Sequence, residues 1–146
     1  MKKIILLTSL LFSLTANEIY KDGDCVSILL GDTTFDKNKM YDRSCVASFI
    51  TKNINAALLT DSMKMKIKNL KTVTSEKDTV IYNYENKEVA DLTDLEIAKR
   101  ISYLCNNESM RTSLLGNNLK LEIRYELQNT TRVINVNKAT CDSIPF

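Results

Sequence analysis

The chain of 146 residues lacks histidine and tryptophan altogether, and it contains only three glycines and one proline. Without histidine, it has no Ser-His-Asp or Cys-His catalytic set, no histidine metal ligand and no imidazole switch near neutral pH. The scarcity of glycine excludes the glycine-rich loops that cradle phosphates, and the Ser-x-x-Lys and Gly-x-Ser-x-Gly motifs are absent. Most of the common catalytic sites are therefore excluded.

Metal-binding motifs are absent as well. The four cysteines include no Cys-x-x-Cys pair, which would indicate a zinc site or a thioredoxin-type redox site. The aspartates between positions 22 and 42 do not follow the spacing of a calcium-binding loop. We therefore expect no metal ion and no cofactor.

The N-terminal residues have the pattern of a secretory signal peptide. Two lysines follow the initial methionine, the apolar run Ile4–Leu14 comes next, and small residues end it at Thr15 and Ala16. This run is too short and wrongly flanked for a membrane span. We expect residues 1–16 to be a bacterial signal peptide and residues 17–146 to form one domain in the periplasm or the medium. An uncleaved anchor is the alternative, because Leu14 is large for its place in a cleavage site.

The exported part of the chain is balanced in charge. The whole chain has 20 basic and 18 acidic residues, and the signal segment holds two of the basic residues and no acidic one. The remainder therefore carries 18 charges of each sign and has no basic field that would attract nucleic acid. After Ala16 no apolar run approaches the roughly 20 residues that a bilayer span requires, so no stable membrane span is expected after cleavage.

The spacing of the apolar residues predicts an α+β domain. Apolar residues within Met40–Leu59 recur at steps of three and four, which is typical of a helix with one buried stripe. Strict alternation predicts strands at Met63–Lys68 and Leu119–Leu127. Aromatic and β-branched residues favour a strand at Thr79–Tyr84, and a last strand is expected at Arg132–Val136.

Two helices are expected between the second and third strands. Thr93 and Glu96 form a capping box, which predicts a helix to about Asn106. A second helix is expected over residues 108–115, with Asn107 at its N-cap and Gly116 as its left-handed end. The predicted order is α-β-β-α-α-β-β, in a small antiparallel sheet with helices packed mainly on one face. Cys25–Leu30 is too short for its periodicity to distinguish a strand from a helical turn.

The four cysteines favour two disulfides, because the chain is expected to be exported. Three connectivities are possible, and we expect Cys25–Cys45 and Cys105–Cys141. The first would join the N-terminal segment to the first helix, and the second would join the helix that ends near Asn106 to the end of the last hairpin. A redox-active thiol is the alternative, although no motif that lowers a thiol pKa is visible.

Two surfaces are candidates for binding. Tyr82 and Tyr84 share one face of their strand and could contact a glycan or a peptide, although such pairs often cover a half-buried sheet. Lys64, Lys66 and Lys68 share one face of the strand expected at Met63–Lys68 and could meet an anionic partner. The alternative for these lysines is the protection of an edge strand against pairing with other chains.

Paired carboxylates leave one catalytic alternative open. Asp91 and Asp94 flank a predicted helix start, where acidic residues favour the helix dipole, and Glu122 and Glu126 lie on the solvent face of a predicted strand. A carboxylate-dependent hydrolase needs two acids across a cleft, one of them with a raised pKa. The sequence supplies the acids and does not show a cleft.

The second half of the chain resembles a recurrent type of small exported bacterial protein of unknown function. The residues that carry the resemblance are Tyr82-x-Tyr84, Leu104-Cys105, Met110-Arg111 with Leu114-Leu115-Gly116, the strand that holds Tyr125, and Cys141. Such proteins place a helix cysteine and a terminal cysteine around a helix–hairpin unit. The resemblance implies the Cys105–Cys141 pairing and an α+β fold, and it implies no activity.

These observations together favour an exported, non-catalytic protein that binds an envelope protein partner, as an inhibitor, an immunity-type factor or an assembly accessory. The sequence alternatives are a small carboxylate-dependent envelope hydrolase and a small-ligand or glycan-binding module.

Overall fold

The structure is a computed structural model that describes residues 25–60 and 68–144. The expected signal peptide lies outside the described residues, as do positions 63–67 of the first expected strand. In chain order the described elements are α3 (Val26–Leu30), α4 (Met40–Leu58), β1 (Leu70–Glu76), β2 (Thr79–Asn86), α6 (Asp94–Asn106), α7 (Glu108–Ser113), the 3₁₀ turn η2 (Leu115–Asn117), β3 (Lys120–Leu127), β4 (Thr131–Val136) and α8 (Lys138–Asp142). No helix within these ranges combines the length and the hydropathy of a membrane span.

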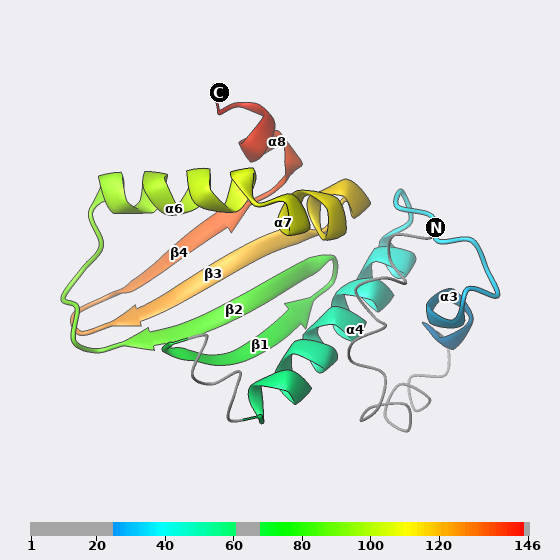
Figure 1. Cartoon of the computed structure of the whole chain (residues 1–146), viewed down its shortest axis with the longest axis horizontal. Coiled ribbons are helices and arrows are strands. Elements are labelled where there is room, and N and C mark those ends of the chain that lie inside the picture. The colour runs from blue at the N-terminus through cyan, green and yellow to red at the C-terminus, as the bar shows by residue number, and fades with distance from the viewer. Residues whose placement is uncertain (1–24, 61–67, 145–146) are drawn as a thin grey trace.

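The fold is α+β, as predicted, and the described residues form a four-stranded sheet in the order β1-β2-β3-β4 (Figure 1). The two outer pairs are antiparallel, but the central pair of β2 and β3 is parallel. The expectation of a wholly antiparallel sheet is therefore wrong for the central pair. A parallel pair requires a crossover of a dozen or more residues, and the segment that contains α6 and α7 provides it.

The two faces of the sheet differ in chemistry. Val80, Leu121 and Ile134 lie on the inner face and belong to the buried core. The outer face carries ion pairs, among them Lys71–Glu85 and Arg124–Glu122. Alternating side chains of this kind let one face pack against helices while the other meets water.

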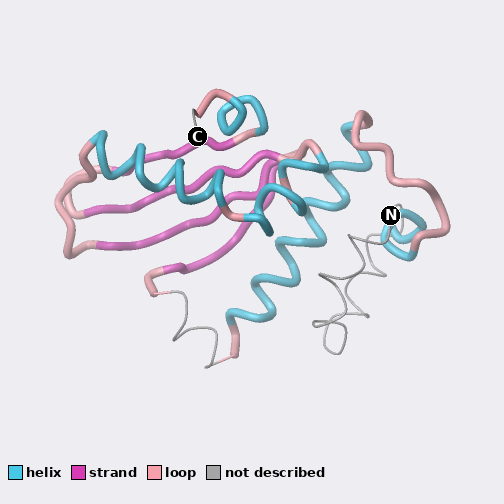
Figure 2. Tube along the Cα trace, turned by 45° about the horizontal axis from the view of Figure 1, so that its top comes forward, coloured by secondary structure: helices cyan, strands magenta, loops and turns pink. Residues whose placement is uncertain are grey.

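Helices cover the inner face from two sides. Helix α4 packs against β1 and β2, whereas α6 packs against β4 and contacts α8. Figures 1 and 2 show α4 running obliquely past the β1 side of the sheet, while α6 lies along the β4 side. The floor between these two helices is formed by β2 and β3.

Helix α4 also protects the edge of β1. The side-chain amide of Asn55 accepts a hydrogen bond from the Val73 backbone N–H at 2.9 Å and donates one to the Val73 carbonyl oxygen. The hydroxyl of Thr51 donates to the carbonyl oxygen of Thr74 at 3.3 Å. One helix thus satisfies backbone groups that an edge strand would otherwise leave open to pairing with another chain.

The predicted helix starts are confirmed, but one predicted end is wrong. The capping box of Thr93 and Glu96 is formed, and the Asn107 side chain accepts a hydrogen bond from the Met110 N–H. Gly116 lies within η2 and does not have a positive φ, whereas Asn118 takes the left-handed conformation with φ 58°. Asparagine tolerates this conformation better than most residues, so the stop lies two positions later.

Of the strand expected at Met63–Lys68, only Lys68 belongs to the described residues. Lys68 lies in a turn, and β1 starts at Leu70. The segment Cys25–Leu30 is helical from Val26, and a short helix that sequence periodicity did not reveal, α8, follows β4. Helices of five residues are too short to show a periodic pattern.

The two disulfides link Cys25 with Cys45 and Cys105 with Cys141, and no described cysteine is free. These are the two pairs expected from the order of the elements. The first joins the N-cap of α3 to α4, and the second joins α6 to α8. Each cross-link holds a short helix to a long one, which suits a domain with a small core.

A buried aspartate forms a further cross-link between elements. Asp78 lies in the β1–β2 turn, and its side chain is 6% exposed. Its carboxylate lies 3.3 Å from Arg43 Nε on α4 and 3.6 Å from Lys120 Nζ on β3. The turn, the first long helix and the third strand are therefore held at one point.

Candidate functional site

A groove of about 600 Å³ lies between α6 and the inner face of the sheet. Its floor is formed by β2, through Tyr84 and Asn86, and by β3, through Ile123, Tyr125 and Leu127. We call it the tyrosine groove, after the two tyrosines of its floor. Its volume lies within the range of small-molecule and peptide pockets, so the groove is the main candidate site in the described part of the chain.

The two tyrosines of the floor stack on each other. Because β2 and β3 are parallel and in register, Tyr84 and Tyr125 are direct neighbours. Their ring centroids are 5.2 Å apart, with an angle of 21° between the ring planes. Burial raises the pKa of Tyr84, with a smaller contribution from Tyr125. The Tyr84 phenol therefore remains a neutral hydrogen-bonding group at physiological pH.

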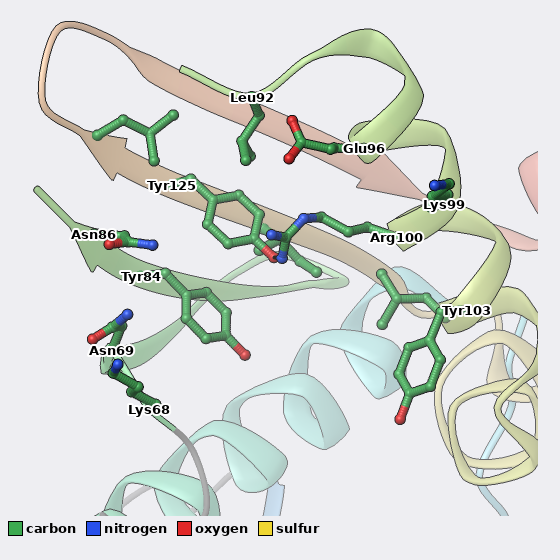
Figure 3. A pocket seen from close by; sticks show the side chains of 13 residues that line it. Lys68, Asn69, Tyr84, Asn86, Leu92, Glu96, Lys99, Arg100, Tyr103 and Tyr125 are labelled. Carbon is green, nitrogen blue, oxygen red and sulfur yellow. Dashed lines mark hydrogen bonds between the residues drawn. The ribbon is translucent and has the colours of Figure 1, made fainter. Parts of the chain in front are cut away.

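Helix α6 forms one wall of the groove (Figure 3). The Arg100 guanidinium carbon lies 4.8 Å from the ring centroid of Tyr125, which is a cation–π contact. Arg100 Nη1 also donates a hydrogen bond to the Tyr125 hydroxyl at 3.0 Å. Figure 3 shows Lys99 and Glu96 on the same helix, and Lys68 and Asn69 at the opposite side of the groove.

The outer rim of α6 exposes large apolar side chains. Tyr103 lines the groove and is 71% exposed, and Leu95 is 65% exposed. Leu95, Lys99 and Tyr103 follow one another at steps of four, so they share one side of α6. The groove is therefore bordered by apolar surface that no described element of the chain covers.

The residues predicted from the sequence are only partly brought together. Tyr84 and Lys68 line the tyrosine groove. Tyr82 lies on the same face of β2 but packs against the core, and burial raises its pKa to about 12. Lys64 and Lys66 lie outside the described residues. The tyrosine groove thus includes one member of each predicted group, Tyr84 and Lys68.

Sequence reasoning missed most of the wall. No motif in the sequence assigns a role to Lys99, Arg100 or Tyr103, all of which lie in the helix predicted from the capping box of Thr93 and Glu96. The step of four between Leu95, Lys99 and Tyr103 was the available signal, since it places two large apolar residues on one exposed helix side.

The carboxylates proposed for hydrolysis do not converge. Asp91 forms a bidentate pair with Arg132, and this hydrogen bonding lowers the Asp91 pKa. Hydrogen bonding with Lys87 likewise lowers the pKa of Glu126, which lies with Glu122 on the outer face of the sheet. A general acid needs a raised pKa and a cleft, whereas the pKa values of Asp91 and Glu126 are lowered and neither residue lines the groove.

Within residues 25–60 and 68–144, no three histidine, cysteine or acidic side chains come close enough together to form a ligand set.

Comparison with known proteins yields two structural neighbours. The chain is similar to the pilotin EpsS of the Vibrio vulnificus type 2 secretion system, with a TM-score of 0.57 and 18% identity over 76% of this chain and 100% of that chain. It is also similar to the type II secretion system pilotin AspS of Vibrio cholerae, with a TM-score of 0.52 and 17% identity over 70% of this chain and 98% of that chain. At these identities the likeness establishes a shared fold.

No protein-family model and no curated protein sequence matches the chain. The likeness is therefore one of structure alone.

Proposed function

We propose that this protein, which shares its fold with two type 2 secretion pilotins, is an exported, non-catalytic assembly accessory that binds a protein partner in the cell envelope. The tyrosine groove is the binding site in this proposal. The observation that carries it is the floor of Tyr84 and Tyr125 beside the exposed Tyr103, because uncovered aromatic surface of this kind marks sites of protein recognition.

The fold likeness supports an accessory role in assembly rather than an inhibitor or an immunity factor. Both neighbours are pilotins, and the chain spans all or nearly all of their length. The expected signal peptide and the two disulfides agree with work outside the cytoplasm.

The glycan-binding alternative is less well supported by the geometry. Sugar rings stack on open aromatic faces, but Arg100 lies over the ring of Tyr125 and Tyr84 stacks beside it. The ring face of Tyr125 that a sugar would stack on is therefore already covered by Arg100. A peptide can instead insert side chains beside the rings and along Tyr103.

The test is site-specific photo-cross-linking in cells that express the whole chain. A photoreactive amino acid replaces Tyr103 in one variant and Tyr41 in a matched control. Both are exposed tyrosines on long helices, but only Tyr103 lines the groove. We expect the variant at position 103 to cross-link one defined envelope protein and the variant at position 41 to give no such product.

Two results would contradict the proposal. One is the same product from both positions, which would mean that the cross-linking does not depend on the groove. The other is the absence of any protein product from position 103 when the protein is expressed and correctly oxidised.

A further inference from the structure

The charges that line the tyrosine groove have an excess of one sign. Lys68, Lys99 and Arg100 contribute three cations, and Glu96 is the one carboxylate among the lining residues of the described part. Both the backbone N–H and the hydroxyl of Thr93 donate hydrogen bonds to Glu96 at 2.8 Å. This carboxylate therefore serves mainly the helix cap, with weaker electrostatic interactions with Lys99 and Arg100. Three cations against one carboxylate still leave the groove with an excess of positive charge.

Arg100 is oriented for a ligand. Its contacts with Tyr125 use one of the five guanidinium N–H groups and one face of the plane. Arg100 forms no ion pair within the described ranges, although surface cations elsewhere in the fold are paired, as in Lys87–Glu126. A guanidinium held in place by an aromatic ring is well suited to bind a carboxylate through two parallel hydrogen bonds.

Neutral polar groups lie beside these cations. The Tyr84 hydroxyl and the side-chain amides of Asn69 and Asn86 line the groove and make no hydrogen bond with any described residue. Amides of this kind offer both donors and acceptors, which match the N–H and C=O groups of a peptide backbone. Lipid headgroups offer acceptors and few donors, so the set favours a peptide over an anionic membrane surface.

We infer that the tyrosine groove binds an acidic peptide segment of the partner, whose carboxylates meet Arg100 and Lys99 and whose apolar side chains lie against Tyr103 and the floor. This inference rests on the proposed function and adds the chemistry of the bound segment. The positive charge of the groove draws the segment in, and the apolar rim holds it.

The test is selection from a random dodecapeptide phage library against the protein purified as the cell exports it. Selected peptides are synthesised, and their affinities are measured by fluorescence anisotropy. We expect acidic residues to exceed basic ones in the selected peptides. Arg100→Gln should weaken binding about fivefold, and Lys99→Glu should weaken it further. Lys39→Glu, a reversal at an exposed lysine outside the groove, should leave the affinity unchanged.

The outcomes separate the inference from the proposed function. If the selected peptides have no excess of acidic residues but no longer bind the Tyr103→Ser variant, the acidic specificity is overturned. The groove would then remain the binding site. Binding that Tyr103→Ser and Arg100→Gln leave unchanged would overturn both. The acidic-peptide inference would also be overturned by binding to a membrane instead of a peptide. In that outcome no peptide is selected, phosphatidylglycerol vesicles bind the unmodified protein, and they do not bind the Arg100→Gln variant.

Discussion

Replacement of Asn55 by alanine should destabilise the fold far more than its position on α4 suggests. The side-chain amide of Asn55 pairs with both the N–H and the C=O of Val73, and the Val73 side chain is 0% exposed. Alanine removes both partners, and each buried backbone group left without one costs about 1–3 kcal/mol. Because water can reach part of the β1 edge, we expect a total loss of about 2–4 kcal/mol. That is a large fraction of the 5–15 kcal/mol of a typical domain.

Urea unfolding measures this loss as a shift in midpoint at constant m-value. Asn83→Ala is the matched control, because its amide donates only long hydrogen bonds of 3.3 and 3.4 Å to two threonine hydroxyls on the wet face. Water can replace those bonds, so we expect a change within about 0.5 kcal/mol. Hydrogen exchange gives an independent measurement, since the Val73 amide should lose its protection only in Asn55→Ala. Equal losses in both variants, with Val73 still protected, would refute the reasoning.

Three further predictions concern the rest of the fold. Asp78→Asn should lower the free energy of unfolding by about 3 kcal/mol, because it breaks the buried ion pair with Arg43. Unfolding in guanidinium chloride measures this change, and a loss below about 1 kcal/mol would contradict the prediction. Replacing both Cys105 and Cys141 with alanine should lower the free energy of unfolding by about 3–4 kcal/mol, because the unfolded chain loses a cross-link. A melting temperature equal to that of the unmodified protein would rule this out. Burial raises the pKa of Tyr82 to about 12, so the neutral phenol favours the folded state. Its contribution to the free energy of unfolding is complete below about pH 10, the ordinary tyrosine pKa, and is lost as the pH rises to about 12. The ultraviolet absorbance of the phenolate should show a tyrosine that titrates near pH 12 and is missing in Tyr82→Phe, whereas the raised pKa of Tyr84 should persist in that variant.

The elements that sequence reasoning recovered are those whose signals are local. The capping box of Thr93 and Glu96 and the N-cap of Asn107 depend on residues within one turn, so they could be identified without knowledge of the fold. The left-handed stop was misplaced because both Gly116 and Asn118 can end a helix, and the choice depends on how the chain enters β3.

Strand pairing depends on tertiary structure and was only partly predictable. Alternation placed Leu119–Leu127 in a strand with the correct inner face, but it carries no information on the direction of the neighbouring strand. Asn55 illustrates the same limit within a helix. From the sequence it is a polar residue off the apolar stripe of α4, and only the position of β1 beside the helix reveals that it satisfies a strand edge.

The candidate site was predictable only where composition is unusual. Tyr84 stood out in a chain with six tyrosines because Tyr82 lies two positions away. Arg100 did not stand out, since its significance depends on Tyr125, which is 25 positions further along the chain. The parallel pairing of β2 and β3 brings Tyr125 beside Tyr84. This is the pairing for which the expectation of an antiparallel sheet was wrong.

The distribution of paired and unpaired charges connects the fold to the proposed function. On the outer face of the sheet, lysine and arginine lie beside glutamate, so that face is electrically balanced and well hydrated. In the tyrosine groove, Lys99 and Arg100 form no close ion pair with a described carboxylate, although both help to lower the pKa of Glu96 on the same helix. Exposed ion pairs contribute little to stability, so the fold has little to gain from pairing these two cations. Their excess positive charge, beside uncovered aromatic surface, is instead better explained by the binding of an acidic partner.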